Sequence, residues 1–382
     1  MKNKFTPLMF LISLGAGGIA ISGFSFLNYT AEHGKGLVYI SQILSINSMF
    51  LEVLFYRLAE IIMGVFALIH VYLTIYLLKI YIPWLKSAEY KIIKNDPLKN
   101  ASLVTPFISL AMTMNVFLGV IRYFIPIAAQ NLQMFMFSGF IIWFILWLAL
   151  MKTEISLLKI SFSKNFDISQ INFGWLLHPF ALGMVTVTGM GIAALAQDYI
   201  LASTAMFLSL ISGTMGLFLL TVKLITLFKS HITAPGLPKK QFLPSFLIVI
   251  PNITLYAISF FRFGHYLETK MHFEMGSYFI IVMLLSFTFE IWYLSFGIAL
   301  LRDYLKKEMR EEFHISQWGF ICPFVAFSVL AAFIHNLFIP SLYFSSFILL
   351  VILFTASLFF YLLNRHIKCV RNKKIKFTCM TD

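Results

Sequence analysis

The chain has 382 residues, of which 60% are hydrophobic and only 12% are charged, and its mean hydropathy is +0.86. Soluble domains contain about 25% charged residues, so this composition excludes an ordinary soluble globular protein. The net charge is +13, but the basic residues lie in short runs between apolar stretches, which indicates a membrane topology signal and argues against nucleic-acid binding.

The apolar stretches predict ten transmembrane helices, because about 20 consecutive apolar residues are needed to cross a bilayer. We expect an all-α integral membrane domain over residues 1–364, arranged as five helical hairpins around a central pore, and a basic tail over residues 365–382. The predicted spans cover residues 7–28, 50–80, 102–124, 132–154, 174–196, 199–227, 245–265, 276–301, 317–338 and 341–364.

The distribution of lysine and arginine predicts the orientation of these helices. Most of the basic residues lie near the N-terminus, in the loops 86–100, 152–170, 229–243 and 302–314, and in the tail. The alternate connections, such as 126–130, 196–198 and 338–340, contain almost none. Basic loops stay on the cytoplasmic side, so we expect a multi-pass protein of the cell (inner) membrane with both termini in the cytoplasm.

A repeated proline lies in the first third of the later odd-numbered helices. Neighbouring members of this set are 72 or 73 residues apart, and such regular spacing is typical of a repeated unit. A membrane helix tolerates proline where neighbours or water can satisfy the freed carbonyl, so we expect helix kinks around a central axis. Proline is also common in membrane helices in general, and that explanation stays open. The prolines are Pro106, Pro179, Pro251 and Pro323.

The residue before each proline, followed in steps of four, defines one face of each helix. This face is small or mildly polar and contains no aromatic residue, whereas Phe107, Phe180 and Phe324 follow the prolines on another face. We interpret the first face as a pore wall, with the aromatic rings packing outward. Close contacts between helices also select serine and threonine, so the pattern has a second explanation. The predicted pore-lining residues are Thr105, Ser109, Thr113, His178, Thr186, Thr254, Cys322 and Ala326.

Several ionisable residues fall inside the predicted spans, where charges are costly and often functional. Arg57 and Glu60 are three residues apart on the second span, so we expect them to pair with each other. Glu290 lies on an even-numbered span, where we expect it to bond to a neighbour or to be protonated. Arg262 and His265 lie at the outer end of the seventh span, and they are candidates for an outer vestibule that collects anions or for an interfacial anchor.

Three short segments resemble the tellurite-resistance/dicarboxylate-transporter family, which includes plant slow-type anion channels and fungal malate and sulfite permeases. The ninth span, from Trp318 to Phe327, is similar to the family pattern W-x-x-x-F-P-x-x-x-F. The opening Phe5-Thr-Pro-Leu-Met-Phe10, followed by glycines at 15, 17 and 18, resembles the family's first helix. The segment Asn95-Asp-Pro-Leu-Lys99 is similar to the family's approach to the third helix.

This resemblance implies ten helices in five hairpins, an anion pore through each protomer and a homotrimer. It also implies a pore closed by a phenylalanine immediately before the ninth-span proline. This chain has Cys322 at that position, so the gate candidates are Cys322, Phe320 and Phe324.

The combined expectation is a channel or uniporter for small anions such as chloride, nitrate, sulfite or dicarboxylates. The alternatives are a proton-coupled exporter of sulfite or C4-dicarboxylates, with His178 carrying the proton, and a membrane-anchored redox subunit that binds haem or quinone through histidines of the spans. We expect no enzymatic activity, no catalytic residues, and no cofactor or metal site. The expected partners are small anions, the lipid bilayer and further copies of the chain.

Overall fold

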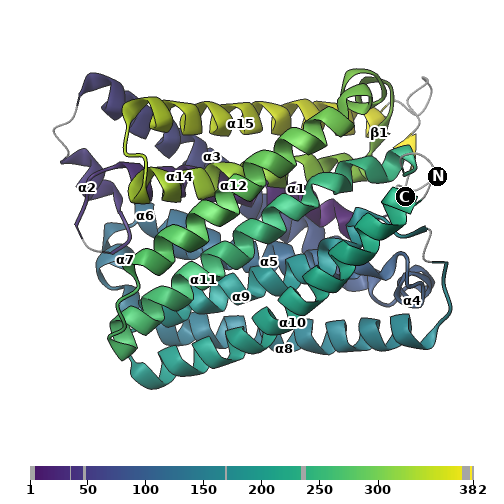
Figure 1. Cartoon of the computed structure of the whole chain (residues 1–382), viewed down its shortest axis with the longest axis horizontal. Helices are drawn as coiled ribbons and strands as arrows, with labels where there is room; N and C mark the ends of the chain where they lie inside the picture. The colour runs from purple at the N-terminus through teal and green to yellow at the C-terminus, as the bar shows by residue number, and fades with distance from the viewer. Residues whose placement is uncertain are drawn as a thin grey trace.

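The computed structural model describes residues 5–34, 36–45, 49–167, 170–233, 238–371 and 379–380. Within these residues, ten helices are long and apolar enough to cross a membrane, which confirms the predicted all-α membrane fold. The helices run roughly side by side, and α1 (Phe10–Thr30) begins at the same end of the bundle at which α15 (Leu342–Arg371) ends (Figure 1). We call this end the terminal end. The opposite end, where α2 (Ile40–Leu44) and α7 (Pro126–Gln130) lie, is called the far end.

The odd-numbered spans form an inner ring of helices. Successive members contact each other around the ring, and the last contacts the first. A short 3-10 helix precedes each member of the ring. The inner helices, each after its 3-10 helix, are η1 Pro7–Met9 with α1 Phe10–Thr30, η2 Asn100–Val104 with α5 Thr105–Val116, η5 Phe173–Leu176 with α9 Leu177–Leu195, η6 Lys240–Ile248 with α11 Val249–Met271, and η8 Ile315–Phe320 with α14 Ile321–Leu337. A π-helical turn, η3 Phe117–Ile121, and the short α6 Arg122–Phe124 continue α5.

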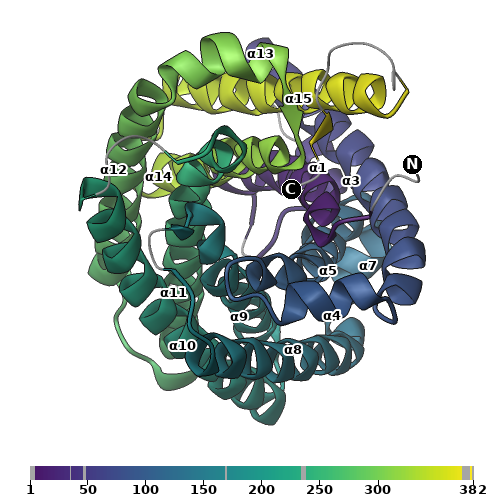
Figure 2. The same ribbon diagram turned by 90° about the vertical axis from the view of Figure 1, so that its right-hand side faces the viewer.

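The even-numbered spans lie outside this ring (Figure 2). Between 56% and 100% of the most apolar window of each inner span is buried, compared with 28% to 44% for the outer spans. Lipid can therefore cover most of the surface of the outer helices, whereas more than half of each inner span is covered by protein. The outer helices are α3 Phe50–Trp84, α8 Leu132–Ser163, α10 Tyr199–Thr233, α12 Gly276–Leu300 and α15 Leu342–Arg371.

Short elements connect the spans. At the terminal end, two-residue strands β1 and β2 pair in parallel. Several outer helices are also longer than the apolar stretches expected from the sequence. For example, α8 has 32 residues, which gives a length of about 48 Å at 1.5 Å per residue. The hydrocarbon core of a bilayer is only about 30 Å thick. The connecting elements are α2 Ile40–Leu44, α4 Ala88–Lys94, α7 Pro126–Gln130, η7 Tyr304–Glu308, α13 Met309–Glu311, β1 Phe313–His314 and β2 Cys379–Met380.

The repeated prolines lie where a 3-10 helix changes to an α-helix. Pro106 is the second residue of α5, and Pro179, Pro251 and Pro323 are the third residues of α9, α11 and α14. A proline in the first turn costs little, because the amide hydrogen that it lacks would have no intrahelical acceptor there. The prolines therefore mark where four of the five inner α-helices begin, and α1 begins at Phe10 without one.

Glycines allow α1 to pack closely at the centre of the bundle. A Cβ atom at Gly17 would lie 2.6 Å from the side chain of Met112 on α5 and 2.7 Å from Nδ1 of His70 on α3. These distances are shorter than any van der Waals contact, so a larger residue would push α1 away from both neighbours. The close approach explains why the window of this first span is 94% buried.

Candidate functional site

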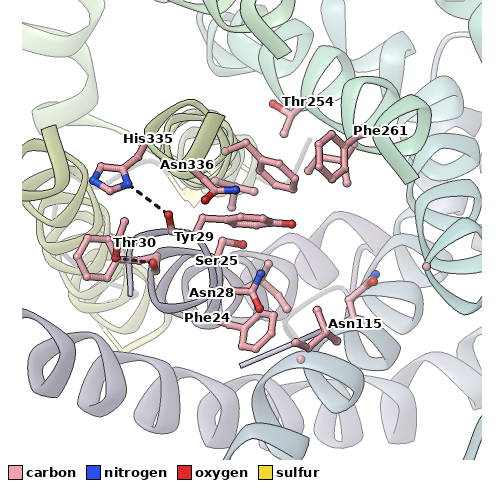
Figure 3. Close-up of a pocket in the computed structure, with 18 of the residues that line it drawn as sticks. Phe24, Ser25, Asn28, Tyr29, Thr30, Asn115, Thr254, Phe261, His335 and Asn336 are labelled. Atoms are coloured by element: carbon pink, nitrogen blue, oxygen red, sulfur yellow. Dashed lines mark hydrogen bonds between the residues drawn. The ribbon is translucent and has the colours of Figure 1, made fainter. Parts of the chain in front are cut away.

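A cavity of about 1300 Å³ lies inside the ring of inner helices, and all five of them contribute side chains to its wall. The lining continues to residues of the far-end connections, including His33, Gly36 and Pro340, so the cavity opens toward the far end. Figure 3 shows side chains of α1, α5, α11 and α14 around this space.

The floor of the cavity lies near the starts of the inner α-helices. All five inner helices begin at the terminal end, so the lowest-numbered lining residue on each helix is the deepest. These residues, which we call the cavity floor, are Leu14, Met112, Phe180, Pro251 and Cys322. Phe180 and Cys322 are only 3% and 8% exposed, so their neighbours fill most of the space around them. The floor is apolar except for the cysteine thiol.

Above the floor, uncharged polar groups interrupt the apolar wall. Asn115 donates from Nδ2 to the hydroxyl of Thr188 on α9 at 2.7 Å. Nδ1 of His335 lies 3.2 Å from the carbonyl oxygen of Tyr29 (Figure 3). The lining also includes Ser25, Asn28 and Asn336. The wall thus offers amide and hydroxyl groups, which can replace part of the hydration shell of a small solute.

Arg262 places a positive charge on the cavity wall. Its Nη1 donates to the carbonyl oxygen of Val187 on α9 at 2.5 Å, and it forms no ion pair among the described residues. A guanidinium has five N–H donors, so further donors remain for a ligand. Gly191 leaves room for this group, since a Cβ atom there would lie 2.7 Å from Nη1.

Acidic residues of the lining lie nearer the mouth of the cavity. His265, the second predicted vestibule residue, also lines the cavity and lies 3.3 Å from the carboxylate of Glu268. The remaining acidic residues of the lining are Glu32 and Glu52. Arg262 lies deeper than His265 on α11, so the positive charge inside the cavity belongs to Arg262.

Three of the predicted pore-lining residues, Thr254, Cys322 and Ala326, line this cavity. The other five side chains point to neighbouring helices or segments instead of into it. Their partners are the carbonyl oxygen of Pro7 for Thr105 (2.6 Å), Ser13 for Ser109 (2.5 Å), His70 for Thr113 (2.8 Å), Glu154 for His178 (2.7 Å) and Ser212 for Thr186 (2.8 Å).

The inner helices differ in rotation about their own axes, which explains this division. The lining of α14 starts at the residue before the proline, that of α11 starts at Pro251 itself, and that of α9 starts at Phe180, the residue after its proline. Each step of one residue turns the helix face by about 100°. The same offset from the proline therefore points in different directions on different helices.

Two of the three gate candidates lie away from the cavity. Phe320 packs near the ring of Tyr304, at a centroid distance of 6.1 Å. Phe324 makes an edge contact with Phe354 on the outer helix α15, at 5.0 Å. Phe180, expected to pack outward, instead forms part of the floor. A lining face spaced at 180, 184, 187 and 191 is visible in the sequence, but nothing there distinguishes it from the neighbouring faces.

The ionisable residues of the spans are bonded to protein groups. The expected pairing of Arg57 with Glu60 is confirmed at 2.7 Å. Nδ1 of His178 contacts the fully buried Glu154, and Lys223 nearby donates to the carbonyl oxygen of Trp175 at 3.1 Å. This cluster lies among α8, α9 and α10, outside the cavity lining, so a proton on His178 does not meet a solute in the cavity directly.

His70, a buried histidine of the second span, has two protein partners. The two ring nitrogens of His70 lie 2.7 Å from the carbonyl oxygen of Ser13 and 2.8 Å from the hydroxyl of Thr113. With both nitrogens bonded to protein atoms, His70 serves to join α3 to α1 and α5 in this structure.

Comparison with known proteins gives one family. A family model described as voltage-dependent anion channel matches residues 4–364, which include all ten spans. No curated protein matches the chain.

Proposed function

The chain belongs to the voltage-dependent anion channel family, and from this premise we propose that it is a channel or uniporter for small anions whose path includes the central cavity. Membership agrees with the resemblance read from the ninth span and supports an anion channel or transporter. The single observation that carries the proposal is the cavity itself, a space of about 1300 Å³ inside the inner ring with an arginine on its wall.

Two features favour anions in this space. The first is Arg262, whose charge is not neutralised by a carboxylate among the described residues. The second is the position of the floor at the first turns of α9, α11 and α14. The N-terminal end of a helix carries a partial positive charge and stabilises anions. An anion that reaches the floor therefore lies beside the N-terminal, positive halves of three inner helices.

We propose that the floor is the gate of this path. Phe180 supplies the bulky ring there, and Cys322 occupies the place at which the family resemblance implies a phenylalanine. In this arrangement the aromatic ring comes from α9 instead of α14. Displacement of Phe180 would join the cavity to the starts of the inner helices at the terminal end.

The charge distribution supports one orientation in the membrane. The basic loops at the terminal end support a cytoplasmic location of both termini, so the cavity would open to the outside of the cell membrane. We propose in addition that the protein assembles as a homotrimer with one path in each protomer, as the family resemblance implies. Chloride, nitrate, sulfite and malate are the anions to compare.

Anion flux into liposomes that contain the purified protein tests the proposal. Flux should exceed that of empty liposomes, and a small hydrophilic methanethiosulfonate added from the cavity side should block it by reacting with Cys322. The matched control is Cys322→Ser, which keeps the tail cysteines and should conduct without being blocked. If no anion crosses faster than in empty liposomes, the proposed function is wrong. If flux is present but the reagent has no effect on the unmodified protein, the path does not pass Cys322.

A further inference from the structure

A buried carboxyl group lies directly behind one polar residue of the cavity wall. Thr254 lines the cavity three residues above Pro251 of the floor (Figure 3). Its hydroxyl is hydrogen-bonded to Oε1 of Glu290, which belongs to the outer helix α12. Glu290 is fully buried and does not line the cavity. The threonine hydroxyl is therefore the group that connects this carboxyl with the space inside the ring.

The hydrogen bonds of Thr254 limit the ways in which its single proton can be used. The hydroxyl oxygen lies within hydrogen-bonding distance of two acceptors, Oε1 of Glu290 and the carbonyl oxygen of Ile250 at 3.2 Å. A hydroxyl has one proton to donate. If Glu290 is ionised, Thr254 must donate to it. If Glu290 is protonated, the carboxylic acid donates to Thr254, and the threonine proton is free for Ile250 or for a solute in the cavity.

The surroundings of Glu290 favour the neutral acid. Its Oε2 has no hydrogen-bond partner among the described residues, and an ion buried at this depth without a countercharge is unfavourable. Helices α11 and α14 and the 3-10 helix η6 pack against α12. None of their ionisable groups pairs with Glu290 in the described part of the chain.

The charged groups of these elements have partners elsewhere. Arg262 bonds to Val187, His265 pairs with Glu268, Lys240 pairs with Glu308, and Lys270 donates to Gln197. The other titratable side chains of α11, α12 and α14 are Tyr256, Tyr266, Tyr278, Tyr293, Cys322 and His335.

We propose that Glu290 is a positioning residue that makes anion passage depend on a proton. This inference rests on the proposed anion path. When Glu290 is protonated, Thr254 can donate its hydroxyl proton to an anion immediately above the floor. When Glu290 is ionised, it accepts that proton, and Thr254 offers only an oxygen lone pair to the anion. The proton comes from a hydronium ion in the cavity: Thr254 passes its own proton to Glu290 and takes one from the hydronium ion, which leaves as water.

The pH dependence of anion flux in liposomes tests this inference. In the unmodified protein, flux should fall by at least about tenfold between acidic and alkaline pH on the cavity side, the lower limit of the factor that corresponds to one lost hydrogen bond to a charged group. Glu290→Gln keeps a donor next to Thr254 and cannot ionise, so its flux should stay near the acidic level at every pH. Thr254→Val should be slow at every pH. The matched control is Thr186→Val, which removes a buried hydroxyl outside the cavity and should keep the unmodified pH profile.

Infrared spectroscopy gives a readout that a merely structural role would not change. A C=O stretching band of a protonated carboxylic acid should weaken as the pH rises and should be missing from Glu290→Gln. If Glu290→Gln folds and its pH profile matches that of the unmodified protein, the inference is wrong. If Glu290→Gln does not fold, Thr254→Val provides the test. A pH profile of flux in Thr254→Val that matches that of the unmodified protein would also overturn the inference. If the unmodified protein passes no anion at any pH, the proposed function fails, and this inference fails with it.

Discussion

Replacing Arg262 with glutamine removes a positive charge from the cavity wall and leaves a shorter, neutral side chain that ends in an amide, so the bond from Nη1 to the carbonyl oxygen of Val187 is lost as well. A sphere with the volume of the cavity has a radius of about 7 Å. An anion at its centre would be attracted to a wall charge by about 0.6 kcal/mol in bulk water and by about 2.4 kcal/mol at an effective dielectric constant of 20. We therefore expect Arg262→Gln to lower the anion concentration in the cavity, and the flux, by about threefold to about sixtyfold.

The assay is the initial rate of anion flux into liposomes, measured from low to high ionic strength. The loss should be largest at low salt and should shrink toward 1 M salt, where the screening length falls to about 3 Å. Arg262→Lys keeps the charge and should retain most of the flux. The control Arg57→Gln removes an arginine that is paired with Glu60 and lies outside the cavity lining, so it should behave like the unmodified protein. Equal rates for Arg262→Gln and the unmodified protein at low salt would refute the electrostatic reasoning.

Three further predictions concern the gate, the arginine and the topology. Phe180→Ala should raise anion flux by widening the floor and should lower stability by about 3 kcal/mol, as expected for a buried phenylalanine; liposome flux and thermal unfolding measure both, and unchanged flux would remove Phe180 from the gate. Gly191→Ala should displace the Arg262 guanidinium and reproduce the salt-dependent loss of Arg262→Gln, and a profile like that of the unmodified protein would show that the guanidinium finds another position. A cysteine in place of the exposed Lys239 should react with an impermeant thiol reagent from the cytoplasmic side of the membrane, and labelling from outside intact cells would reverse the proposed orientation.

The candidate site was partly predictable from the sequence. Arg262 and His265 could be found because basic residues are scarce at that end of the spans, and both line the cavity. Cys322 could be found because its helix carries the clearest family pattern. Phe180 could not be assigned in this way, because the sequence does not record how far α9 is rotated relative to α14. The same limit applies to Ser109, which faces α1 and not the cavity.

The sequence by itself determined the number of spans and the membrane class, because the length of an apolar stretch and the charge of a loop are properties of consecutive residues. It also located the repeated prolines, which we expected to kink the inner helices and which lie in the first turns of α5, α9, α11 and α14. Only the tertiary structure decided which face of each inner helix lines the cavity, and that Glu290 lies behind Thr254. Helix rotation is set by packing between residues far apart in the chain, such as Gly17 of α1 against Met112 of α5. No local pattern contains that information.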